Sequence, residues 1–173
     1  MKFKLTVLLL IAAVALTLSP QESTARKASY GECITVNPIG LAFGGINAMY
    51  ERQISKNNSF TAGGYLYSSG DWMGYGIGGS YRWYIDLFKT RKRPIEGFAV
   101  GPRVRIDTWT WEGGRVSPYD DGITFTIGGE AVYKWIWDDF VLETGIVVNF
   151  NVAGLEGLDY SPFGLVGSIG YAW

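Results

Sequence analysis

The chain has 173 residues, one cysteine, no histidine and a formal net charge of −1, from 15 basic and 16 acidic residues. This charge balance gives no electrostatic basis for binding nucleic acid, and a single cysteine excludes a disulfide within the chain. Glycine (24 residues) and aromatic residues (16%) are both abundant. Such a composition favours a small β-barrel, in which small residues relieve crowding and aromatic rings anchor the membrane interfaces.

Residues 1–25 have the pattern of a cleaved secretory signal peptide. Two lysines precede an almost unbroken apolar run at 5–18, which is shorter than the roughly 20 residues of a membrane-spanning helix. Residues 23–25 form a small-x-small cleavage site, and Ser19 offers an earlier one. The remainder, 26–173, is expected to be one domain. It contains no second long apolar run, so a membrane-spanning form of it must be a barrel.

Apolar and polar residues alternate repeatedly after residue 26, whereas no helical period is sustained. The first alternating segment is the least defined, because residues 37–40 (Asn-Pro-Ile-Gly) can end a strand, bend it or begin a plug segment. We predict an all-β, eight-stranded antiparallel up-and-down transmembrane β-barrel. Its expected strands are 33–38, 44–54, 59–68, 73–86, 96–109, 122–137, 140–152 and 162–173.

The predicted connections alternate in length. With both termini in the periplasm, the short connections 55–58 and 138–139 lie on the periplasmic side. The connections 111–121 and 153–161 are longer and would be extracellular, as is typical of outer-membrane barrels. The connection 87–95 departs from this scheme, since it is long for a periplasmic turn.

Charged residues occupy one face of the predicted strands and apolar residues the other. If the apolar face contacts lipid, the charged face lines the lumen. An eight-stranded barrel has an interior only wide enough for side chains to fill it, and buried charges must pair because an isolated buried ion is very costly. We therefore predict a packed, ion-paired lumen without an open pore. Its members would be Glu51, Arg82, Arg103, Arg105, Asp107, Glu130, Lys134 and Glu143.

Aromatic residues gather near the ends of the predicted strands, as expected where Trp and Tyr lie at the headgroup level of a membrane. The 110–121 loop is the best candidate for contacts with a surface ligand, because rigid scaffolds usually carry recognition on loops. Its candidate contact residues are Trp109, Trp111 and Tyr119, although rim anchoring explains the tryptophans equally well. The predicted periplasmic interface residues are Trp83, Trp135, Trp137, Tyr171 and Trp173.

The last strand resembles the C-terminal signature by which the barrel-assembly machinery recognises outer-membrane barrels. Its apolar face ends on an aromatic residue, Trp173, although Ser168 stands where that signature usually has glycine. The chain from Cys33 to Trp173 resembles the OmpA/OmpX-like family of small eight-stranded outer-membrane barrels. Segments 34–40, 46–52, 81–84 and 97–102 resemble, more narrowly, an uncharacterised family of bacterial outer-membrane barrels. This resemblance implies a place in the bacterial cell envelope, with outer-membrane lipids as partners, and implies no particular activity.

The sequence gives little support for catalysis. No histidine is present to serve as a base for a Ser or Cys nucleophile. A carboxylate-only site at Glu130 and Glu143 is conceivable, but their role as ion-pair partners is favoured. Residues 74–79 match G-x-G-x-x-G, yet the residues that follow read as a strand and not as the required helix. These glycines instead suit barrel curvature and the close approach of neighbouring side chains. We expect no enzyme activity and no cofactor.

Three further features of the sequence bear on binding: metal-ligating residues, the single cysteine and a basic run. No Cys/His cluster supports a metal site, and Cys33 is expected to be a buried or unused thiol. The basic run Lys89–Arg93 is either a contact for anionic headgroups or peptidoglycan or, as favoured here, a solvated turn.

Three functions are compatible with this pattern. The favoured one is an integral outer-membrane barrel with a structural or surface-interaction role through its extracellular loops. The second is a narrow transporter of small apolar molecules, in which residues 38–44 and lumenal glycines leave a gap. The third is a secreted, soluble, lipocalin-like ligand-binding barrel, in which the apolar face points inward. Periodicity alone does not distinguish inside from outside.

Overall fold

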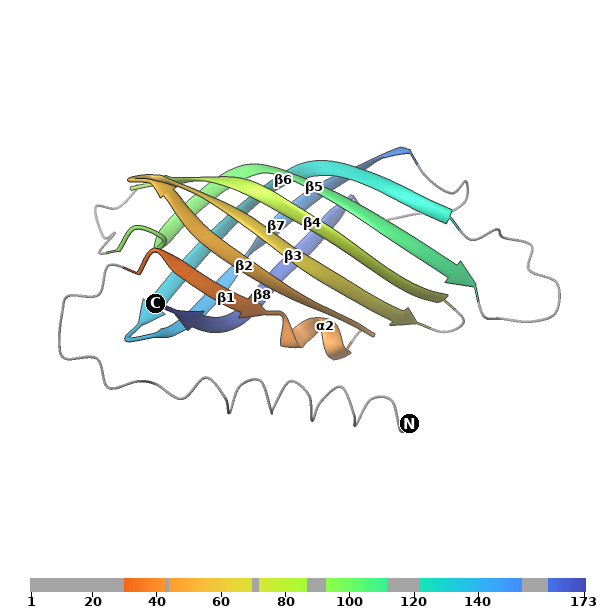
Figure 1. Ribbon diagram of the computed structural model, residues 1–173, viewed down its shortest axis with the longest axis horizontal. Helices are drawn as coiled ribbons and strands as arrows, with labels where there is room; N and C mark the ends of the chain where they lie inside the picture. Colours follow the sequence, from red (N-terminus) through yellow and green to blue (C-terminus); the bar gives the residue numbers. More distant parts are fainter. Residues whose placement is uncertain (1–29, 43, 70–71, 87–92, 112–121, 154–161) are drawn as a thin grey trace.

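The structure, a computed structural model, describes residues 30–42, 44–69, 72–86, 93–111, 122–153 and 162–173. These residues form a closed barrel in which each strand pairs antiparallel with the next and β8 pairs with β1 (Figure 1). The predicted all-β, eight-stranded up-and-down barrel is confirmed. Its elements are β1 (Glu32–Val36), α2 (Pro38–Ala42), β2 (Gly45–Ser55), β3 (Asn58–Ser69), β4 (Trp72–Ile85), β5 (Gly97–Trp111), β6 (Gly122–Trp137), β7 (Phe140–Ala153) and β8 (Phe163–Ala172).

Several predicted features lie outside the described residues: the signal peptide 1–25, most of the basic run Lys89–Arg93, and the loops 112–121 and 154–161. Among the described residues, no helix has the length and apolar character needed to cross a membrane. Below, the "turn end" of the barrel is the end with Tyr30, Trp173 and the Asp138–Asp139 turn. The "loop end" is the opposite end, where β5 and β7 finish.

The first predicted strand is wrong in its extent, because β1 stops at Val36 and the short helix α2 follows. Asn37 and Pro38 explain this change of direction. The Asn37 Oδ1 accepts a hydrogen bond from the backbone N–H of Gly40 at 3.1 Å, which is the contact of a helix N-cap residue, and proline is favoured at the next position. The helix ends where Gly44 adopts a φ of 82° and donates its N–H to the Leu41 carbonyl at 3.3 Å, as C-terminal glycines commonly do.

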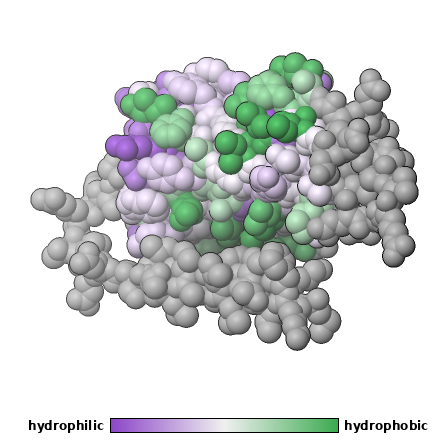
Figure 2. Space-filling view, turned by 45° about the vertical axis from the view of Figure 1, so that its right-hand side comes forward, coloured by the Kyte–Doolittle hydropathy of each residue, from purple (hydrophilic) through white to green (hydrophobic). Residues whose placement is uncertain are grey.

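The two faces of the barrel wall differ sharply in polarity. In β5, Arg103, Arg105 and Asp107 face the lumen, while Val104 and Ile106 between them are exposed on the outside. Some of the most exposed side chains of the molecule are apolar: Leu165 is 85% exposed and Phe163, Ile77 and Ile123 are at least 65% exposed. Figure 2 shows large apolar areas on the outer surface. The alternation read from the sequence therefore places apolar residues outside and charged residues inside.

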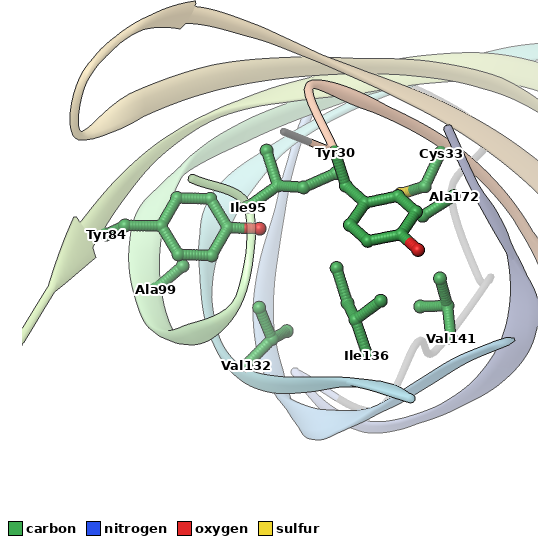
Figure 3. Packing of buried hydrophobic residues seen from close by; sticks show 9 residues of the cluster. All are labelled: Tyr30, Cys33, Tyr84, Ile95, Ala99, Val132, Ile136, Val141 and Ala172. Carbon is green, nitrogen blue, oxygen red and sulfur yellow. The ribbon is translucent and has the colours of Figure 1, made fainter. Parts of the chain in front are cut away.

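The turn end is closed by apolar side chains that point into the barrel (Figure 3). Ile95, from the connection between β4 and β5, is fully buried in this cluster. Burial and a hydrogen bond from the Tyr30 hydroxyl to Asp139 Oδ1, 2.7 Å long, raise the pKa of Tyr30 to about 12. The cluster comprises Tyr30, Cys33, Tyr84, Ile95, Ala99, Val132, Ile136, Val141 and Ala172.

Arg93 also belongs to this closed end and is not a solvated turn residue. Its guanidinium lies 4.5 Å from the centre of the Tyr30 ring and donates to the Ile136 carbonyl at 2.5 Å. A cation over an aromatic face is attracted by the ring quadrupole. Part of the long β4–β5 connection therefore folds back into the barrel mouth, which accounts for a length that did not fit a tight turn.

Candidate functional site

The middle of the lumen is occupied by a buried ion-pair cluster centred on Arg82 of β4. Its guanidinium contacts one carboxylate from each of three other strands: Glu51 at 2.6 Å, Glu130 at 2.6 Å and Glu143 at 2.8 Å. The Arg82 side chain is only 6% exposed. Its Nη2 also donates to the second oxygen of Glu143 at 3.0 Å, so this pair has the two-pronged geometry that suits arginine and carboxylate.

Lys134 of β6 is the second cation of the cluster, and its side chain is fully buried. Its ammonium contacts Glu51 and lies 3.1 Å from Glu143. It also donates to the Cys33 Sγ at 3.3 Å. The single thiol of the chain is thus buried beside the ion pairs, in keeping with the expected unreactive role.

Hydroxyl groups complete the cluster. Ser59 and Tyr84 both donate to Glu51 Oε1, at 2.5 and 2.6 Å, and Ser80 donates to Glu130 Oε1 at 2.6 Å. Sequence reasoning missed these partners because it considered charge alone. The signal was available, since Ser80, Arg82 and Tyr84 alternate along one strand and must face the same side.

A second, smaller group of charges lies on the loop-end side of this cluster. Arg105 pairs with Asp107 at 2.6 Å and its guanidinium lies 5.2 Å from the centre of the Tyr65 ring. Arg103 donates to the Tyr65 hydroxyl at 3.1 Å, and its nearest carboxylate oxygen, on Glu130, is 3.9 Å away. The structure therefore brings all eight predicted lumenal charges into one interior, in two groups.

The lumen is not packed along its whole length. On the loop-end side of the ion pairs it holds a cavity of about 560 Å³, lined by residues that include Tyr65, Arg103, Trp109 and Asn149. The predicted packed lumen is thus right for the turn-end half and wrong for the other.

The glycines of the G-x-G-x-x-G segment make room for larger lumenal side chains. A Cβ on Gly74 would lie 2.7 Å from the Trp109 ring, and one on Gly76 would lie 2.1 Å from Asp107 Oδ1. This finding agrees with their predicted structural role. No dinucleotide-binding helix follows them, since β4 continues to Ile85.

The five predicted interface aromatics lie at the turn end of the barrel wall. Trp83, Trp137 and Trp173 are about half exposed on the outer face, at 46, 52 and 49%. Trp135 lies between neighbouring rings, with its centre 6.4 Å from that of Trp137. The Tyr171 ring is stacked 6.1 Å from that of Trp173. Aromatic rings therefore gather in several contacting groups near this end, an arrangement called the aromatic surface below.

Trp109 is not a surface contact residue of the loop. It is 6% exposed, faces the lumen, donates from Nε1 to Thr124 at 3.2 Å and lies edge-on to the Tyr67 ring at 5.4 Å. The physical reason is strand alternation: Trp109 lies within the predicted strand 96–109 and has the same inward parity as Arg105 and Asp107, and β5 itself continues to Trp111. The side chain of Trp111 and all of Tyr119 lie outside the described residues.

The described residues contain no group of three or more His, Cys, Asp or Glu side chains arranged to hold a metal ion. Glu130 and Glu143, the conceivable carboxylate pair, both contact Arg82. Chemically, the ion pairs link strands β2, β4, β6 and β7 across the lumen. The second group of charges places two arginines, Arg103 and Arg105, in the lining of the cavity.

The chain was compared with protein-family models, curated proteins and solved structures. None of them matches it. The architecture of a small eight-stranded barrel is therefore shown by the structure itself, whereas membership of the OmpA/OmpX-like family remains a prediction.

Proposed function

We propose that this chain is an integral protein of the bacterial outer membrane, which spans the bilayer as a barrel without an open pore and has a structural or surface-interaction role. The observation that carries the proposal is the polarity of the wall. Leu165 and Ile77 are 85% and 68% exposed, while Lys134 and Glu51 are 0% and 2% exposed. A water-soluble barrel buries apolar side chains and exposes charge, so this polarity supports lipid as the surrounding medium.

The aromatic surface at the turn end gives independent support. Trp83, Trp137 and Trp173 are large amphipathic residues on the outer face at one level of the barrel. Girdles of such residues flank the apolar band of outer-membrane barrels, because their rings prefer the headgroup region. The lipocalin-like alternative requires the apolar face to line the interior, and in this chain that face points outward.

The ion-pair cluster supports the absence of an open pore. Arg82 and Lys134 connect carboxylates from opposite parts of the wall, and the apolar cluster around Ile95 fills the turn end beneath them. Ions would have to cross both layers. Addition of the protein to planar bilayers should therefore give no sustained single-channel steps. Steps as large as those of a wide porin channel would overturn this part of the proposal.

The membrane location is tested by fractionation and by gel mobility. The protein expressed with its leader should partition with outer membranes and require detergent for extraction. The folded barrel should migrate differently on a gel from the same sample after boiling in detergent. A monomer that remains in the soluble fraction without detergent would favour the secreted, lipocalin-like alternative.

The surface role is tested with protease added to intact cells. Chymotrypsin cleaves after aromatic residues, and Tyr119 lies in the 112–121 loop that we propose is extracellular. Cleavage of intact cells should yield fragments that separate near Tyr119 and near Tyr160, which lies in the other proposed extracellular loop, 154–161, while the outward Trp83 of the barrel wall stays uncut. Cleavage only after cells are permeabilised would place these loops on the periplasmic side.

We also propose that the barrel-assembly machinery recognises β8, whose outward residues end on Trp173. The backbone carbonyl of Trp173 accepts hydrogen bonds from Gly31 and Glu32 at 3.2 Å. Trp173, which directly follows β8, thus takes part in the β8–β1 pairing that closes the barrel, and this position supports a role of the strand in assembly.

A further inference from the structure

We infer that the loop-end cavity binds an amphiphile with one acyl chain and an anionic headgroup, which enters sideways through the barrel wall beside α2. This inference rests on the proposed function, because it takes lipid as the medium outside the wall. Three observations carry it: the break in strand pairing, the extent of the cavity and the charge inside it.

The wall changes its construction between β8 and β2. Strand β1 pairs with β8 only from Cys33–Ala172 to Val36–Ile169, and its register with β2 also ends at Val36. Beyond that level, β8 from Gly164 to Ser168 keeps its pairing with β7, and the start of β2 keeps its pairing with β3. The element that lies between these two strands is the short helix α2 (Figure 1). A ladder of backbone hydrogen bonds is thus replaced here by helix packing.

The packing of α2 is shallow. Ile39 and Leu41 are 57% and 45% exposed. The Ile39 side chain lies against β8 at Gly167, where its Cδ1 occupies the space of a Cβ, 2.5 Å from the position such an atom would take. Displacing α2 therefore requires few apolar contacts to be broken, and Gly44, with its φ of 82°, provides a flexible joint on its C-terminal side.

The cavity reaches this seam. Its lining includes Gly40 of α2, Ile46 of β2, and both Leu165 and Val166 of β8. Val166 faces the lumen, whereas Leu165 is 85% exposed on the outer surface. The cavity lining thus takes in residues of both faces of the wall beside α2, as it also does at Leu66 of β3 and Tyr75 of β4.

The charged groups that line the cavity are balanced: Arg82, Arg103 and Arg105 against Asp107, Glu130 and Glu143. Arg103 and Arg105 line it, with side chains 12% and 20% exposed. Asp107 pairs with Arg105 at 2.6 Å, but Arg103 is 3.9 Å from the nearest oxygen of Glu130, beyond hydrogen-bond distance. The other oxygen of Glu130 accepts from Arg82 at 2.6 Å. Arg103 is thus placed to donate two hydrogen bonds to a carboxylate or phosphate.

An amphiphile is the ligand that matches both the charged interior of the cavity and the apolar surface beside α2. Its anionic head would contact Arg103 in a chamber of about 560 Å³, a volume within the usual range for small-molecule sites. Its acyl chain would pass beside Ile39 and lie along the apolar outer surface near Leu165. A small polar anion leaves the apolar seam unused, and an alkane adds nothing to the contacts that Arg103 already has with the Tyr65 hydroxyl at 3.1 Å and Glu130 at 3.9 Å.

The test uses the full mature protein folded into phosphatidylcholine nanodiscs, with palmitate and its uncharged analogue hexadecanol as probes. Native mass spectrometry should show one palmitate bound per barrel, and hexadecanol should bind at least tenfold more weakly. Arg103→Gln should lower palmitate affinity on the order of tenfold, the effect of losing a charge-assisted hydrogen bond. Arg52→Gln is the matched control, because Arg52 lies on the outer side, 3.4 Å from Glu32 with a side chain 60% exposed.

The route through the wall is tested with a palmitate analogue that carries a diazirine at the end of its chain. After irradiation, labelled peptides should come from α2 and from residues 163–169. Uniform labelling of the outer face, equal binding of hexadecanol, or an Arg103→Gln variant that binds like the wild type would overturn the inference. Labelling confined to lumenal residues would overturn the lateral route. If the wild type folds in nanodiscs but binds no palmitate, only this inference fails, whereas failure to enter the lipid contradicts the proposed function.

Discussion

At the scale of residues, Arg82 shows how this barrel keeps charge in its interior. A buried ion is stable only when its partners replace the hydrogen bonds and the charge stabilisation that water provided. The guanidinium has three carboxylates within 2.8 Å, and those carboxylates receive further hydrogen bonds from Ser59, Ser80 and Tyr84. The members of this network come from most of the strands, so any one of them fixes the positions of several others.

Replacing Arg82 with methionine should therefore be strongly destabilising. The variant removes the cation that contacts Glu51, Glu130 and Glu143. Lys134, which still contacts Glu51 and Glu143, carries one charge against these three buried carboxylates, so we expect a loss of about 3–5 kcal/mol in the free energy of unfolding. Urea unfolding of the barrel in lipid vesicles, followed by tryptophan fluorescence, measures the difference.

Arg52→Met provides the comparison, because Arg52 forms an exposed ion pair with Glu32. Such pairs contribute about 0–1 kcal/mol. Equal losses for the two variants would mean that the lumenal network adds no more to stability than a surface pair.

The sequence identified the eight lumenal charges because alternation determines the face of a strand. It did not identify which of these charges contact one another, because the position of each residue along the barrel axis depends on the register of its strand. Arg103 and Arg82 both face inward, yet only Arg82 reaches three carboxylates. Trp109 was misplaced for a different reason: it was assigned to the rim as the last residue of its predicted strand, although alternation with Arg105 and Asp107 already gave it an inward face.

At the scale of elements, α2 is the feature that departs most from a regular barrel. The Asn-Pro pair stops β1 because proline lacks the N–H that a strand ladder needs. Asn37 then caps the helix through the N–H of Gly40. The sequence analysis recognised a break at residues 37–40 but no helix, since five residues are too few to display a helical period.

Asn37→Ala should loosen α2 while leaving the barrel folded. The loss of an N-cap costs about 1 kcal/mol, and the effect should be confined to the helix because the strand ladders of β2 and β8 do not depend on it. Hydrogen exchange should accelerate at Gly40, whose N–H loses its acceptor, and stay unchanged at Ala131 in β6.

Asn37→Asp is the matched variant, because aspartate also accepts the N–H of the third helical residue. It should retain slow exchange at Gly40. Equal acceleration in both variants would show that the side chain of residue 37 does not cap α2.

At the scale of the whole molecule, the barrel combines an apolar exterior with a charged interior that is closed at its turn end by apolar side chains. Alternation in the sequence predicted the two faces and the closed sheet. It did not predict the cavity, because the volume left by lumenal glycines depends on how far opposite side chains such as Trp109 and Tyr65 extend across the lumen. Which face meets lipid is the property that the proposed function depends on most.

Two arginine substitutions on β7 test that property. Ile146 and Val152 both face outward and are 53% and 58% exposed, but Ile146 lies near the middle of β7, whereas Val152 lies at its loop end. In a bilayer, arginine on the lipid face costs about 2–4 kcal/mol at the midplane and about 0–1 kcal/mol near an interface. Ile146→Arg should therefore destabilise the barrel by that larger amount and Val152→Arg only slightly, as measured by urea unfolding in vesicles.

The same pair separates a membrane barrel from a soluble one. In water, an exposed arginine at either position is well solvated, so both substitutions should change stability by no more than about 0.5 kcal/mol. A large cost at residue 146 with a small cost at residue 152 requires a medium whose polarity varies with depth. Because the two sites share a strand and a degree of exposure, the difference between them reports that medium.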